Sequence, residues 1–162
     1  MSNAPYPSQL RLESEADTAK LAAAFARHMR AGDVLLLTGG LAAGKTYFVR
    51  AAVAALGSPD AVSSPTYTLA NIYACPKGSV VHMDAYRLKS PADFADLALE
   101  DEFARGIAFI EWGAMLAGEF DDYIGLELAL VPQSEHARVA SFTSVGPRGA
   151  ELLAQVLKDF TA

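Results

Sequence analysis

Short apolar runs and segments with helical spacing alternate along this chain of 162 residues. Three of the runs, at 34–38, 80–84 and 107–112, consist mainly of Val, Leu, Ile, Met and Phe. Runs of this length without regular alternation are typical of strands that are buried on both faces. We therefore expect three buried strands, and we note that two of the apolar runs end in an acid, Asp84 and Glu111.

Other stretches alternate apolar and polar side chains, which predicts strands with one face toward water. Residues 62–73 begin as a hydroxyl-rich segment and pass into an alternating strand, which a turn at 76–79 joins to strand 80–84 in a predicted hairpin. Residues 123–131 and 137–143 alternate more regularly and predict a second antiparallel hairpin. A weak alternation over residues 8–12 predicts an edge strand.

Helices are predicted between these strands. Ser14 and Ser90 each precede an acid by three residues, and a serine in that place accepts a hydrogen bond from the first turn of a helix. Pro91 strengthens the second start, because proline suits the first helical position. The sequence predicts helices over 14–32, 45–56, 90–99, 100–104 and from 147 onward.

The segment between strand 34–38 and helix 45–56 matches the phosphate-loop pattern G-x-x-x-x-G-K-[ST], with Gly39, Gly44, Lys45 and Thr46 in the fixed places. Glycines allow successive backbone N–H groups to turn around a polyphosphate, and the positive end of the helix dipole points at the same place. Lys45 adds a positive charge, and Thr46 offers a hydroxyl to magnesium. The pattern therefore predicts nucleotide-phosphate binding.

The order of the elements predicts an α/β protein with a P-loop NTPase-like three-layer fold. We expect a mixed sheet with a parallel core around the phosphate loop and antiparallel strands at its edge. The length predicts a single domain over residues 1–162, since a chain of this size buries about two thirds of its unfolded surface.

Composition narrows the class of protein. The chain has 13 basic and 19 acidic residues, a formal net charge of −6, and its basic residues are scattered. Independent DNA or RNA binding is disfavoured, because that affinity depends on neutralising many phosphates. No apolar run reaches the length of a membrane span, and the N-terminus lacks the features of a signal peptide. The single Cys75 suits a reducing compartment, so we expect a cytoplasmic protein without a membrane contact.

Asp84 and Glu111 are the candidate acids. If their strands run parallel to 34–38, both carboxylates lie at the strand ends that face the phosphate loop. A magnesium ion needs oxygen ligands there, and an attacking water needs orienting. Capping of the next helix is the alternative, and it is stronger for Glu111 than for Asp84. His82 has no Cys or His partner at ligand spacing, so we expect it to be packed or hydrogen-bonded.

Four segments together resemble the bacterial TsaE (YjeE) family, the ATPase of tRNA threonylcarbamoyladenosine synthesis. The segments are Gly39 to Thr46, Ser64-Pro65-Thr66-Tyr67-Thr68-Leu69, His82 to Leu88, and Ile110-Glu111-Trp112. The resemblance covers roughly residues 10 to 145. It implies an ATP- and Mg²⁺-dependent hydrolase that resets a complex of TsaD-like and TsaB-like proteins, which carry out the transfer, and that meets tRNA only through this complex.

The resemblance also implies roles for individual residues. Lys45, Glu111, Asp84 and Thr66 are the expected catalytic residues, with Thr66 in a switch-like segment. The expected metal ligands are Thr46, Asp84 and Glu111. The expected nucleotide contacts are Gly39, Gly40, Leu41, Ala42, Ala43, Gly44, Lys45, Thr46, Tyr47 and Trp112. The division of labour between Asp84 and Glu111 stays open, and for Trp112 stacking on a base or partner competes with core packing.

The loop departs from the family's usual G-D-L-G-A-G-K-T, because Gly40 replaces the aspartate and Ala42 replaces a glycine. Ala42 tolerates a positive φ poorly, so the loop is expected to be stiffer or shifted. Two other functions stay open. A small-molecule kinase shares the phosphate loop, although no compact arginine-rich lid is present. A non-catalytic, nucleotide-gated binding module would tolerate the changes at Gly40 and Ala42.

Overall fold

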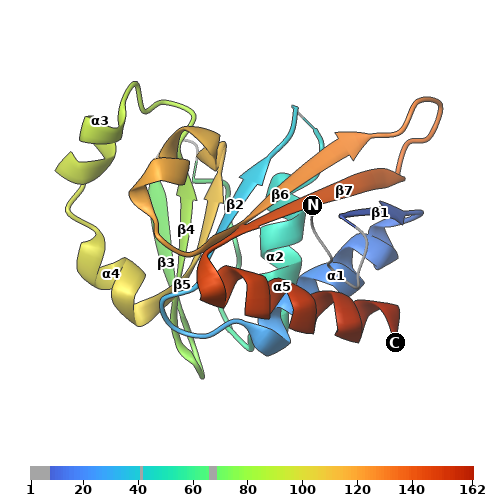
Figure 1. The fold of residues 1–162 in the computed structure, drawn as a ribbon, viewed down its shortest axis with the longest axis horizontal. Coiled ribbons are helices and arrows are strands. Elements are labelled where there is room, and N and C mark those ends of the chain that lie inside the picture. The colour runs from blue at the N-terminus through green and yellow to red at the C-terminus, as the bar shows by residue number, and fades with distance from the viewer. Residues whose placement is uncertain (1–7, 41, 66–68) are drawn as a thin grey trace.

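A seven-stranded sheet organises the computed structural model of this chain, which describes residues 8–40, 42–65 and 69–162 (Figure 1). The strand order is β1-β7-β6-β2-β5-β4-β3. The strands are β1 (Gln9–Leu12), β2 (Val34–Thr38), β3 (Ala70–Cys75), β4 (Gly78–Asp84), β5 (Gly106–Glu111), β6 (Tyr123–Leu130) and β7 (Arg138–Val145).

The sheet has a parallel core and antiparallel edges, which confirms the predicted mixed α/β fold. Strand β2 pairs in parallel with β5 and β6, and β5 pairs in parallel with β4. The β3–β4 and β6–β7 hairpins and the β1–β7 pair are antiparallel. The sequence did not indicate that β6 joins the parallel core directly beside β2, since its alternating pattern fits either direction of pairing.

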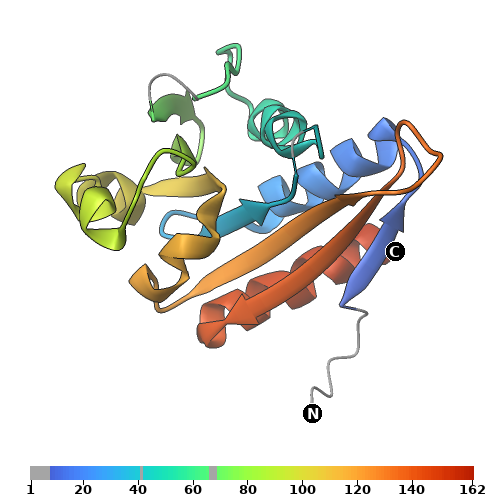
Figure 2. The ribbon, with the colours of Figure 1, turned by 90° about the horizontal axis from the view of Figure 1, so that it is seen from above.

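Helices cover the sheet in two layers (Figures 1 and 2). One face packs against α1 (Glu15–His28), α2 (Lys45–Ala55) and α5 (Gly146–Thr161). The other face, over β2, β4 and β5, packs against α3 (Pro91–Asp96), α4 (Glu100–Arg105) and the 3₁₀ helix η1 (Gly113–Glu119). The buried apolar residues accordingly form two clusters, one on each side of the sheet. None of the described helices is long and apolar enough to cross a membrane.

The predicted starts of two helices are confirmed. The hydroxyl of Ser14 accepts a hydrogen bond from the Asp17 N–H at 3.2 Å, and Ser90 accepts one from the Asp93 N–H at 3.4 Å. These side chains satisfy amides that the first turn of a helix leaves without a partner.

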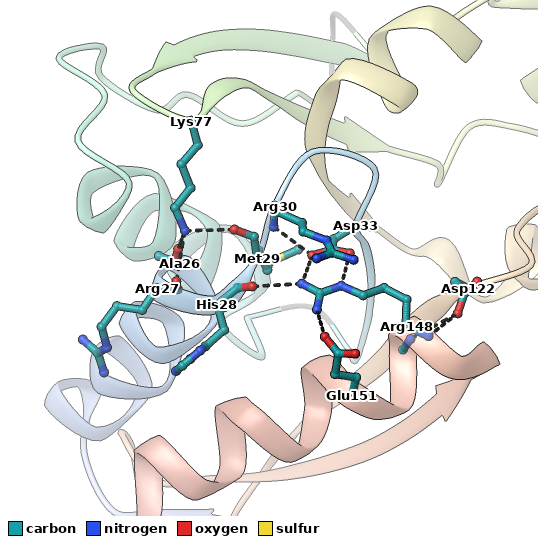
Figure 3. Close-up of polar contacts among 11 residues, drawn as sticks. Ala26, Arg27, His28, Met29, Arg30, Asp33, Lys77, Asp122, Arg148 and Glu151 are labelled. Carbon is teal, nitrogen blue, oxygen red and sulfur yellow. Dashed lines mark hydrogen bonds and ion pairs between the residues drawn. The ribbon is translucent and has the colours of Figure 1, made fainter.

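The predicted ends of the same helices are wrong. Helix α1 ends at His28, four residues before Gly32, because Met29 adopts an extended conformation. The Nζ atom of Lys77, from the β3–β4 turn, then donates to three carbonyls at this helix end, those of residues 26, 27 and 29 (Figure 3). Helix α3 ends at Asp96 and does not reach residue 99, and Ala98 has a φ of +52°.

The amino ends of the parallel strands carry a cluster of paired charges, the Asp33–Arg148 cluster (Figure 3). Arg148 donates from Nε and Nη2 to the two carboxylate oxygens of buried Asp33, at 2.9 and 2.8 Å, and from Nη1 to Glu151 at 2.7 Å. The hydrogen bond with Asp33 raises the pKa of Arg148. Asp122 completes the cluster by accepting from the Arg148 and Gly149 N–H groups in the first turn of α5. This cluster fastens α5 to the start of β2.

Candidate functional site

The loop of residues 39–46 joins β2 to α2 at the opposite, carboxyl edge of the parallel strands. Gly39 has a φ of +141°, and a Cβ atom there would lie 2.4 Å from the Leu128 carbonyl oxygen, so the loop needs glycine to pass this close to β6. Gly44 is the N-cap of α2 with a φ of +102°. Among the described residues no side chain caps α2, in contrast with α1 and α3. Its first turn therefore presents amides and a positive dipole end to an incoming anion.

Lys45 lies folded back on this loop. Its side chain is 6% exposed, and Nζ donates to the carbonyls of Gly39 and Gly40 at 2.8 and 2.9 Å. The same Nζ lies 4.1 Å from the centroid of the Trp112 ring. Burial lowers the pKa of Lys45, while the charges of Glu111 and Asp84 raise it. Its positive charge is thus partly desolvated and is held next to two carboxylates.

The two candidate acids lie side by side at the same edge. In the parallel register Glu111 is opposite Leu37 on one side and Asp84 on the other. Both are nearly buried, at 5% and 8% exposure. Both strands run parallel to β2. This is the arrangement under which the sequence places both carboxylates at the strand ends that face the loop.

Glu111 links the loop to the sheet interior. Its carboxylate accepts from the Thr46 hydroxyl, at 2.8 and 3.0 Å to the two oxygens, and lies 2.5 Å from His82 Nε2. His82 is fully buried, as expected for a packed and hydrogen-bonded residue, and within the described ranges its Nδ1 atom has no hydrogen-bond partner. Asp84 Oδ1 accepts from the Tyr86 N–H at 2.9 Å. Neither acid acts as the cap of a helix in the described structure.

The polar side chains at this edge carry oxygen atoms, the type of ligand that magnesium prefers. Over residues 8–40, 42–65 and 69–162, no group of three or more His, Cys, Asp or Glu side chains could hold a metal. One hydroxyl and two carboxylates, from Thr46, Asp84 and Glu111, line the same pocket. Magnesium is usually bound through one or two carboxylates together with substrate phosphates and waters.

A pocket of about 400 Å³ joins the loop to the acids. It is lined by Ala42, Ala43, Gly44, Lys45, Thr46, Tyr47, Asp84, Glu111 and Trp112 among the expected site residues, and also by Ser64, Glu15, Thr18, His136 and Arg138. Gly39 and Gly40 do not line it but hold Lys45 through their carbonyls. Leu41 and Thr66 lie outside the described residues. The volume is in the range of small-molecule sites.

Trp112 stands at one wall of this pocket. Its backbone is left-handed, with φ +58° and ψ +35°, and its ring packs against Tyr86 with the centroids 5.1 Å apart. Tyr86 is 67% exposed. The two rings thus continue the pocket wall to the protein surface.

Sequence reasoning missed Arg138, which enters the pocket from the start of β7. The guanidinium donates to the Ala43 and Ala42 carbonyls at 2.9 and 3.3 Å, across 95 and 96 positions of the chain. Nothing in the alternation of 137–143 singled it out. Glu15, Thr18 and His136 also line the pocket and were missed. His136 Nδ1 lies 3.4 Å from Glu15 Oε1.

The fold and site define a small α/β protein whose sheet carries a glycine-bounded loop, a lysine and two acids at one edge. More particularly, the chain belongs to the TsaE family: the sequence model described as threonylcarbamoyl adenosine biosynthesis protein TsaE matches residues 12–139. This confirms the resemblance found in the sequence.

Individual relatives support the assignment. The tRNA threonylcarbamoyladenosine biosynthesis protein TsaE of Treponema pallidum is 40% identical over 111 residues, which are 68% of this chain and 82% of the relative. The TsaE protein of Bacillus subtilis is 35% identical over 131 residues, 80% and 79% of the two chains. The crystal structure of Bacillus subtilis YdiB superposes with a TM-score of 0.72 at 26% identity, covering 93% of both chains.

Proposed function

We propose that this protein binds ATP with Mg²⁺ in the 400 Å³ pocket, hydrolyses it slowly, and serves tRNA threonylcarbamoyladenosine synthesis by resetting a TsaD–TsaB complex in the cytoplasm. One observation carries the nucleotide part. The uncapped first turn of α2, the buried Lys45 and the acids of β4 and β5 all face one pocket. Donors for a polyphosphate and ligands for its magnesium ion are therefore brought within reach of a single small molecule.

The residues take the following roles in this proposal. The amides of the loop and the Nζ of Lys45 bind the phosphates, which would draw Lys45 away from the Gly39 and Gly40 carbonyls. Thr46, Asp84 and Glu111 would hold the magnesium ion, which when bound offsets the negative charge of the phosphates. Glu111, hydrogen-bonded to His82, orients the attacking water. Trp112 and Tyr47 line the pocket and contact the nucleotide.

The biological part of the proposal comes from the relatives. They are named as tRNA threonylcarbamoyladenosine biosynthesis proteins, and the family assignment extends over most of the chain. A net charge of −6 with scattered basic residues suits a protein that reaches tRNA through partners and does not bind nucleic acid alone. We therefore propose TsaD-like and TsaB-like proteins as those partners.

The test is ATP hydrolysis by wild type and Lys45→Ala, each alone and mixed with TsaD and TsaB homologues from the same organism. We expect slow hydrolysis by the wild type, stimulation in the mixture, and loss of both in Lys45→Ala. Lys158→Ala, an exposed lysine in the last turn of α5, is the matched control and should behave as wild type. A Lys45→Ala protein as active as wild type would refute the mechanism.

The same assay separates the alternatives. A kinase would consume ATP only with an added hydroxyl substrate and would yield a phosphorylated product. A non-catalytic module would bind ATP tightly, release no phosphate even with partners, and be indifferent to Glu111→Ala. The proposed ATPase instead loses hydrolysis on that substitution.

A further inference from the structure

Arg138 is bound entirely by main-chain carbonyls. Nε donates to Ala43 O at 2.9 Å and Nη2 to Ala42 O at 3.3 Å, both in the loop. Nη1 donates to the carbonyls of Glu135 and Ala137 at 2.9 and 2.8 Å, which fixes the guanidinium relative to the β6–β7 turn. In the described part of the chain no carboxylate accepts from it. The side chain therefore connects one edge of the loop to a different hairpin.

The part of the loop that Arg138 holds is conformationally strained. Ala42 has a φ of +63°, in the left-handed region that costs an L-residue with a Cβ atom roughly 1–2 kcal/mol. The turn is closed by a hydrogen bond from the Ala43 N–H to the Gly40 carbonyl at 3.2 Å. A strained residue persists only where its surroundings hold it in place. Lys45 holds the Gly40 carbonyl of this turn, and the fork from Arg138 holds the carbonyls of Ala42 and Ala43.

Holding these two carbonyls also fixes the direction of two amides. In a planar trans peptide the C=O and N–H groups point in opposite directions. With the Ala42 and Ala43 carbonyls turned to Arg138, the N–H groups of Ala43 and Gly44 are turned away from it. The Ala43 N–H accordingly points across the loop at Gly40.

We propose that Arg138 is a positioning residue for nucleotide binding: it holds Ala42 in the left-handed conformation and so sets the direction of the Gly44 N–H at the start of α2, while the Ala43 N–H closes the turn on Gly40. The inference rests on the proposed function, since it concerns the loop that would hold the phosphates. It explains how this loop functions with alanine at a position where glycine would adopt the same backbone without strain.

The test is a double-mutant cycle of Arg138→Gln and Ala42→Gly, with the Kd for ADP measured by titration calorimetry in the presence of Mg²⁺. We expect Arg138→Gln to weaken binding about tenfold when Ala42 is retained, the loss of one to two hydrogen bonds. In the Ala42→Gly background the same substitution should weaken it by no more than about threefold, because glycine needs no support at this φ. Arg11→Gln, on the neighbouring strand β1, is the matched control and should bind as wild type.

A charge-conserving variant separates positioning from simple attraction. Lysine retains the charge of Arg138 but cannot donate in a fork to two carbonyls. We expect Arg138→Lys to bind ADP as weakly as Arg138→Gln. Adding Ala42→Gly should restore most of the lost affinity in both variants. This variant also provides the test should Arg138→Gln fail to fold.

Three results would overturn the inference. If Arg138→Gln lowers the affinity for ADP equally with and without Ala42→Gly, Arg138 contacts the nucleotide directly. Wild-type affinity in Arg138→Lys would indicate that charge alone matters, and wild-type affinity in Arg138→Gln would indicate no role. Lys45→Ala in the same titrations keeps the two proposals apart. If wild type binds no ADP, the proposed function fails, whereas binding that needs Lys45 but not Arg138 defeats this inference alone.

Discussion

The two edges of the parallel sheet differ in the groups that accept hydrogen bonds from their basic side chains. At the amino edge the guanidinium of Arg148 meets a buried carboxylate, and Lys77 lies on the negative end of the α1 dipole. At the carboxyl edge Lys45 and Arg138 donate instead to neutral carbonyls of one loop. The Arg148–Asp33 pair neutralises charge within the protein, whereas Lys45 and Arg138 form no ion pair among the described residues.

Under the proposed function, the amino edge stabilises the fold and the carboxyl edge serves nucleotide binding. Breaking a buried ion pair is costly because it leaves the other charge uncompensated. A buried cation that forms no ion pair among the described residues, such as Lys45, is itself a destabilising feature, which proteins tolerate mainly at functional sites. The lowered pKa of Lys45 and the raised pKa of Arg148 reflect this contrast.

The largest expected effect on stability is from Arg148→Ala. It leaves Asp33, whose side chain is 4% exposed, without its charged partner, and should lower the free energy of unfolding by about 3 kcal/mol. Thermal unfolding should shift down by roughly 6–12 °C at this chain length. ADP affinity, measured below the transition, should stay within about twofold of wild type.

Arg11→Ala provides the control for that prediction. Arg11 pairs only with exposed Glu13, so its loss should cost at most about 1 kcal/mol. If Arg148→Ala is no less stable than Arg11→Ala, the amino edge does not have the stabilising role assigned to it.

Lys45→Met should not lower the stability of the protein, in contrast with Arg148→Ala. Methionine is apolar and flexible, so it can occupy the place against Trp112 without a desolvated charge. We expect the free energy of unfolding to stay the same or to rise by up to about 1 kcal/mol, with the unfolding temperature changing in the same direction. Saturating ADP, which should stabilise wild type by about 2.7 kcal/mol at a hundred times its Kd, should have no effect on this variant. Calorimetric scans with and without ADP measure both. Destabilisation as large as that of Arg148→Ala would contradict the contrast between the edges.

The smallest effect is expected from Asp159→Asn, which removes a partly exposed carboxylate paired with Arg27 and His28 in the last turn of α1. The hydrogen bond from Arg27 lowers the pKa of Asp159, and the bond with His28 adds to this. The carboxylate therefore contributes stability that is fully present above its ordinary pKa of 3.8 and is lost as the pH falls through the lower folded-state value. Urea unfolding of wild type and Asp159→Asn should differ slightly near neutral pH and converge well below pH 3.8. A difference in free energy of unfolding that grows on acidification would show that the pKa of Asp159 is not lowered in the folded state.

Features that depend on neighbours in sequence were predicted well. The Ser14 and Ser90 caps were predictable because the hydrogen bond they make spans three residues. Asp84 and Glu111 were predicted to share one edge because they close apolar strands, and parallel strands bring their ends together. Their catalytic and metal-binding roles stay predictions.

Contacts across the sheet were not predictable in the same way. Arg138 reaches a loop 95 residues earlier, and Arg148 reaches Asp33 across 115 residues. Both depend on β6 lying beside β2, a strand order that an alternating pattern does not specify. His82 was expected to be hydrogen-bonded, but its partner Glu111 became evident only once β4 and β5 were known to be in register.

Trp112 is the only tryptophan of the chain, and its indole lies 4.1 Å from the ammonium group of Lys45. The protein therefore contains its own optical reporter at the pocket wall. Under the proposed function, an anion that draws that ammonium group off the indole would change the emission of a single fluorophore, and no extrinsic label would be needed to follow the event in real time.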